Sequence, residues 1–84
     1  MSLADLEEEL QQATSEGLQI SLLTSILKKA FGQKKMQYMK QLAQLYTENL
    51  QKYGAEFIEL APQVLKLDST DYELRLHLVK YLMA

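Results

Sequence analysis

Apolar residues recur every three or four positions along most of the chain, which is the spacing of an amphipathic helix. The repeat is clearest over residues 22–31, where polar side chains occupy the opposite face. A longer stripe runs over 34–53, and a shorter one over 3–13. The pattern predicts an all-α fold, a small antiparallel bundle of four helices, or of five if one is interrupted.

Polar residues and glycines mark where the first three helices begin and end. Ser2 followed by Asp5 resembles a capping box, so the first helix should start at residue 3. Residues 14–17 combine capping residues with a glycine, which indicates either a break between two helices or a bend in one long helix. Gly32 and Gly54 follow the next two stripes, and we expect each glycine to end a helix.

The last third of the chain is less regular. Residues 55–67 have helical spacing, but Pro62 lies among them, so a kink or restart is expected there. The capping cluster at 68–71 predicts a final helix that begins near 71 and runs to the end of the chain. Apolar and polar residues also alternate over 72–78, as in a strand, but the leucine content and the caps favour helix.

As a helix, this final segment is apolar on two sides. One side consists of Tyr72, Leu76, Val79 and Met83, and the other of Leu74, Leu78 and Tyr81, with Leu82 between them. Two opposite apolar sides fit either a central helix buried on both sides or a helix that offers one side to a partner. Both interpretations stay open at this point.

Length and composition limit the class of protein. Eighty-four residues fit one domain, so we expect residues 1–84 to form a single helical domain. The chain has no cysteine, and therefore neither a disulfide nor a thiolate zinc site, which favours a reducing compartment such as the cytoplasm. Its start is acidic, unlike a secretory signal. Its apolar runs are far shorter than the roughly 20 residues of a membrane span, so we expect a soluble protein without a membrane partner.

Charge is distributed in three blocks, acidic over 1–27, basic over 28–52 and acidic over 53–84. The lysines that make up the basic patch are Lys28, Lys29, Lys34, Lys35 and Lys40. Such a patch is typical of a nucleic-acid surface, and helix, glycine and helix around Gly32 resemble a helix-turn-helix arrangement. A middle helix between two acidic neighbours gives the same pattern for internal reasons, and the absence of arginine from the patch favours this second interpretation.

The residue types needed for catalysis or metal binding are scarce. With one histidine, His77, and no cysteine, the chain offers neither a Cys/His nucleophile, a serine triad nor a histidine-rich metal site. Its three glycines stand apart and form no phosphate-binding loop. Its paired carboxylates fall at helix starts, where capping accounts for them. We therefore expect no enzyme, no cofactor, no metal and no small-molecule substrate.

These patterns favour a protein–protein interaction module: a small helical adaptor, chaperone-like or inhibitor protein whose partner is another protein or a second copy in a homodimer. Aromatic and aliphatic anchors dominate binding at such surfaces. The predicted anchors on the final helix are Tyr72, Leu74, Leu78, Tyr81 and Leu82. The alternative function is that of a small nucleic-acid-associated regulator that binds through the basic patch.

Overall fold

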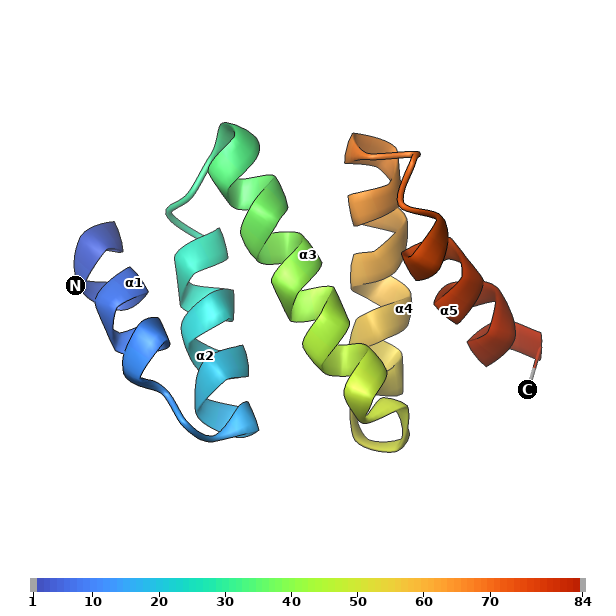
Figure 1. Ribbon diagram of the computed structural model, residues 1–84, viewed down its shortest axis with the longest axis horizontal. Coiled ribbons are helices and arrows are strands. Elements are labelled where there is room, and N and C mark those ends of the chain that lie inside the picture. The colour runs from blue at the N-terminus through green and yellow to red at the C-terminus, as the bar shows by residue number, and fades with distance from the viewer. Residues whose placement is uncertain (1, 84) are drawn as a thin grey trace. The chain divides into compact units, whose positions relative to one another are not determined.

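The computed structural model describes residues 2–83, which form five helices and no strand (Figure 1). The helices are α1 (Leu3–Gln12), α2 (Glu16–Leu27), α3 (Gly32–Glu48), α4 (Leu50–Leu67) and α5 (Tyr72–Met83). The predicted all-α fold class is confirmed, and the final segment is a helix and not a strand. The chain divides within α3 into two compact units, an N-terminal unit of residues 1–42 and a C-terminal unit of residues 43–84.

In the N-terminal unit, α1 and α2 pack side by side and run in opposite directions (Figure 1). The predicted capping box starts α1: the Asp5 amide donates to Ser2 Oγ at 3.3 Å, and the Ser2 amide donates to the Asp5 carboxylate at 3.3 Å. Ser15 caps α2 by accepting a hydrogen bond from the Leu18 amide at 3.2 Å. The polar segment at 14–17 therefore separates two helices and does not bend one. The buried apolar residues of this pair and its following turn are Leu6, Leu10, Leu22, Leu23, Ile26 and Ala30.

The prediction that Gly32 ends the second helix is wrong. Helix α2 ends at Leu27, where the Lys28 amide donates to the carbonyls of Ser25 and Ile26 and tightens the last turn. Gly32 instead starts α3 with a φ of 66°. The left-handed conformation that favours glycine is present, but it reverses the chain before the next helix.

The prediction that Gly54 ends a helix is also wrong. Helix α3 ends at Glu48, because Asn49 has a non-helical backbone, and α4 then runs through Gly54. The rings of Tyr46 and Tyr53 contact each other across this break in a tilted arrangement, with centroids 5.5 Å apart. Inside α4, Tyr53 has non-helical backbone angles, so the irregularity expected at a proline lies nine residues earlier.

Pro62 neither splits α4 nor forces a restart, contrary to prediction. The helix continues through it to Leu67. A proline inside a helix costs about 3 kcal/mol. Here Pro62 is exposed, while Phe57, Ala61 and Val64 on the packed face are fully buried. The burial of that face offsets the lost hydrogen bond.

In the C-terminal unit, α4 and α5 pack side by side in opposite directions (Figure 1). Asp71 caps α5, since the Leu74 amide donates to Asp71 Oδ1 at 3.2 Å, and this confirms the predicted start of the final helix. Leu74 is buried, and the Tyr81 ring meets Phe57 edge-on with centroids 6.3 Å apart. Among residues 2–83, each helix is too short or too polar to cross a membrane.

Candidate interaction surface

One face of α5 packs against α4. Leu74 retains 6% of its exposure, and Leu78 and Tyr81 are half-buried. Gly54 makes this packing possible, because a Cβ on that residue would collide with the Tyr81 hydroxyl and lie 2.7 Å from Cζ. Gly54 is therefore a site of close approach between α4 and α5.

The opposite face of α5 is exposed and apolar. Its residues are Tyr72 (72% exposed), Leu76 (53%), Val79 (45%) and Met83 (82%). We call these four the α5 stripe. They are spaced by four, three and four positions, so they lie along one side of the helix, roughly opposite Leu74 and Tyr81.

Charged residues border the α5 stripe. At 3.6 residues per turn, Glu73 and Lys80 fall along one edge of it, and Arg75 and exposed Leu82 along the other. Arg75 donates to the Ser69 carbonyl at 3.2 Å, in the turn before α5. An apolar centre with a charged border is the usual composition of a protein-binding surface.

The five predicted anchors fall into two groups. Tyr72 and Leu82 are exposed on or beside the α5 stripe, whereas Leu74, Leu78 and Tyr81 lie on the packed face. Helical spacing predicts the two apolar sides correctly but not which of them packs, and the predicted anchors include none of Leu76, Val79 and Met83. The signal in the sequence is Gly54, which marks a close contact with Tyr81 and not the predicted helix end.

The basic patch is brought together only in part. Lys28 and Lys29 lie in the turn after α2, and Lys35 is exposed in the first turn of α3. Lys34 forms an ion pair with Glu7 of α1, with Nζ and Oε1 2.8 Å apart. Lys40 is half-buried and also has an interaction partner.

The ion pair between Glu7 and Lys34 shifts the pKa of both groups. The hydrogen bond from Lys34 lowers the pKa of Glu7. Desolvation raises this pKa, while the hydrogen bond from the Tyr38 hydroxyl and the charge of Lys34 lower it further. The same contact raises the pKa of Lys34. Burial and the hydrogen bond to Glu7 raise the pKa of Tyr38. Lys34 of the basic patch therefore connects α3 to α1 through this ion pair.

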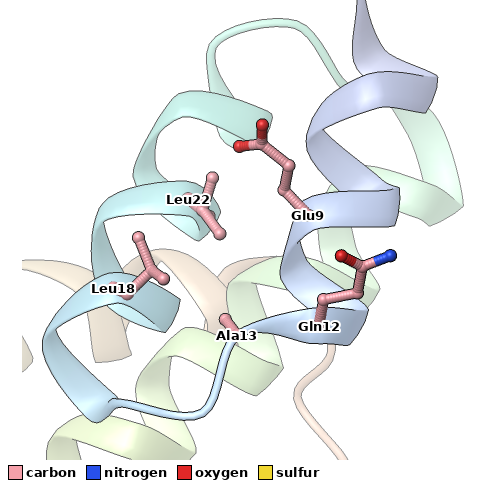
Figure 2. Close-up of a pocket in the computed structure, with 5 residues that line it drawn as sticks. All are labelled: Glu9, Gln12, Ala13, Leu18 and Leu22. Carbon is pink, nitrogen blue, oxygen red and sulfur yellow. The ribbon is translucent and has the colours of Figure 1, made fainter.

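A shallow hollow lies between α1 and α2, with a volume of about 240 Å³ (Figure 2). Glu9 extends from α1 toward α2, where Leu18 and Leu22 line the other side, and Gln12 and Ala13 complete it. Binding sites for drug-sized ligands usually enclose about 300–1,000 Å³. The hollow is smaller than this and holds one carboxylate with no opposing catalytic group among its lining residues.

Over the part of the chain that the structure describes, no three His, Asp or Glu side chains lie close enough together to hold a metal ion. Burial raises the pKa of Tyr46, whose ring contacts that of Tyr53 in a tilted arrangement. Among the described residues, α5 has more exposed large apolar side chains than any other helix. In comparisons with known proteins, no family model, no curated protein and no solved structure matches the chain.

Proposed function

We propose that this protein is a non-enzymatic protein–protein interaction module that binds its partner through the α5 stripe. The observation that supports the proposal is the exposed face of α5, where Tyr72, Leu76, Val79 and Met83 form one continuous row. The row alternates spacings of four and three, which is the repeat by which one helix packs along another. A partner helix or an apolar groove is the complementary surface.

The size of the α5 stripe sets the strength of this interaction. Fully burying one large apolar side chain contributes about 1.5–3 kcal/mol, and the four residues here are already partly covered. Association itself costs roughly 4–15 kcal/mol. The free energy gained by burial exceeds the cost of association by only a small amount, so we expect a dissociation constant of about 1–100 μM. This range fits an adaptor or inhibitor that exchanges partners.

The compartment and the lack of catalysis belong to the same proposal. A chain without cysteine suits a reducing environment, so we place the interaction in the cytoplasm. The one histidine, His77, is exposed on the polar side of α5. We propose neither a substrate nor a cofactor.

The alternative, a nucleic-acid-associated regulator, has weaker support. It relies on the basic patch, of which Lys34 is paired with Glu7. The remaining exposed lysines, Lys28, Lys29 and Lys35, are few for a protein of net charge −2. It predicts salt-sensitive binding to DNA or RNA that K28E/K29E/K35E abolishes.

Site-specific photo-crosslinking tests the proposed function. A photoreactive amino acid replaces Leu76 on the α5 stripe or, as the matched control, His77 one residue away on the polar side. In cells that express the protein, we expect adducts at position 76 to exceed those at position 77 several-fold. Introducing V79E should remove the excess, because a charge in the apolar row must be desolvated on binding.

The proposal fails if positions 76 and 77 give equal adducts, or if V79E leaves the adducts at 76 unchanged. Far-ultraviolet circular dichroism of each variant provides the control for folding. Mass spectrometry of the adducts then distinguishes a second copy of the chain from a different protein.

A further inference from the structure

The charges beside the α5 stripe identify its partner. We propose that the α5 stripe binds the α5 stripe of a second copy of this chain, with the two helices antiparallel. The inference rests on the proposed function and adds the occupant of the surface and its orientation. Charge complementarity along the edge of α5 that contains Glu73 and Lys80 supports it.

The apolar residues pair without a gap in this arrangement. In an antiparallel pair of helices, core residues whose numbers sum to a constant lie opposite each other, so that each of the two kinds of core position in the seven-residue repeat faces the other kind across the interface. Placing Tyr72 opposite Met83 of the second copy also places Leu76 opposite Val79. All four stripe residues are then covered, and each large side chain faces a smaller or more flexible one.

The same register brings opposite charges together. When the stripe residues are the core positions of the repeat, Glu73 directly follows the core residue Tyr72. Lys80 directly follows the core residue Val79 in the same way, so Glu73 and Lys80 lie on the same edge of the helix. Antiparallel helices pair this edge with itself. Glu73 therefore faces Lys80 of the second copy, and the twofold axis repeats the pair, so one interface contains two ion pairs.

A parallel pairing of the same stripes has the opposite result. It matches the edge that holds Glu73 and Lys80 with the edge that holds Arg75, and Arg75 then falls next to Lys80 of the second copy. Two cations in contact across the seam oppose association. The charges on α5 thus favour the antiparallel orientation specifically.

Twofold pairing also closes the assembly. The same patch serves both copies, so a dimer covers both stripes and leaves none for a third chain. A single helix of 12 residues contributes from each side, which places the interface at the small end, below about 1,200 Å² in total. The expected product is a dimer in exchange with monomer, with a dissociation constant of about 10–100 μM.

Charge exchange tests the pairing. We would measure molar mass by sedimentation equilibrium over about 1–500 μM at low salt for the unsubstituted chain, E73K, K80E and E73K/K80E. Each single substitution turns two attractive pairs into two repulsive ones, and we expect it to raise the dissociation constant about tenfold. The double substitution restores both attractions with reversed sign, so its dissociation constant should return to within about threefold of the original.

An equal mixture of E73K and K80E provides the sharpest readout. One chain then carries lysine at both positions and the other carries glutamate, so all pairs in the mixed dimer attract. We expect the mixture to dimerise at least as tightly as the unsubstituted chain, although each variant alone is mostly monomeric. All three substituted proteins change exposed residues, so circular dichroism should find them folded alike.

Two results would overturn the inference. One is an unsubstituted chain that is monomeric at about 500 μM, well above the expected dissociation constant. The other is a dimer that E73K and K80E do not weaken or that the mixture does not restore, which would place the contact elsewhere or in another orientation. If crosslinks at position 76 then join a different protein, the proposed function stands and self-pairing fails; if position 76 forms no excess of crosslinks, both fail.

Discussion

The first and last helices differ in the side chains that they expose to solvent. Helix α1 has one apolar face, formed by buried Leu6 and Leu10, while Asp5, Glu8 and Glu9 are exposed on the outside. Helix α5 has two apolar faces, of which one packs on α4 and the other, the α5 stripe, is exposed. Both helices have side-chain caps and similar lengths, so neither feature distinguishes them.

The difference teaches where this molecule still has binding capacity. The outer face of α1 is charged, and charged side chains are stable in contact with water. The exposed face of α5 has leucine, valine, tyrosine and methionine where the exposed face of α1 has charge. An apolar row of this kind lowers its free energy when a second surface covers it.

Substitution of the packed face of α5 should have the largest effect on stability. Leu74 is buried against α4, so L74E places a charge in an apolar site and should destabilise the C-terminal unit by at least about 3 kcal/mol. On the opposite face, L76E should change the free energy of unfolding by less than about 0.5 kcal/mol. Urea unfolding followed by circular dichroism measures both. Equal effects would remove the distinction between the two faces.

The close approach of α4 and α5 gives the next effect. G54A introduces a Cβ that collides with the end of the Tyr81 side chain, and we expect a loss of about 1–3 kcal/mol. Y81F removes the hydroxyl but leaves ring carbons close by, so G54A/Y81F should recover part of the loss. A double-substitution cycle that finds no coupling between the two positions would contradict this contact.

The helix caps should contribute less. Ser15 accepts a hydrogen bond from the Leu18 amide at the start of α2, so S15A should cost about 1 kcal/mol. S21A is the matched control, because Ser21 is exposed within α2 and takes no part in its cap. Thermal unfolding of the two variants should therefore differ, with the lower midpoint for S15A.

The smallest effect concerns pH and the N-terminal unit. Lys34 lowers the pKa of Glu7 below its ordinary value of 4.5 in the folded state. The unfolded state then binds a proton more readily, so the stability that this pair contributes is present above pH 4.5 and is lost as pH falls through the folded pKa. Thermal midpoints between pH 3 and 7 should decline more for the unsubstituted chain than for E7Q. Parallel declines would show that the ion pair does not act on stability.

The sequence is sufficient for the starts of the first and last helices and insufficient for long-range contacts. The capping box at Ser2 depends on residues three positions apart, and the sequence predicts it. The capping cluster at 68–71 predicts the start of the final helix but does not single out Asp71 as the residue that caps it. The role of Gly54 depends on Tyr81, which lies 27 positions later and approaches it only after α4 and α5 pack. Pro62 was expected to interrupt a helix because its cost is local, whereas the burial of Phe57 and Val64 that offsets this cost is tertiary.

The candidate site shows the same limit. Helical spacing was enough to sort the residues of α5 into two apolar sides. Nothing in that spacing says which side meets α4, because both contain residues of similar size and hydrophobicity. The small Gly54 surface that accommodates Tyr81 selects the packed side, and the other side remains exposed as a consequence.

Thiol labelling of α5 tests the central claim, that this helix has one packed and one open apolar face. The chain has no cysteine, so L76C and L74C each introduce a single reactive group. At about 1 μM, where the expected dimer is dissociated, the thiol at 76 should react within about tenfold of its rate in urea, and the thiol at 74 at least about 100-fold more slowly than in urea. Equal protection at the two positions would contradict the account, because both faces of α5 would then be covered within one chain.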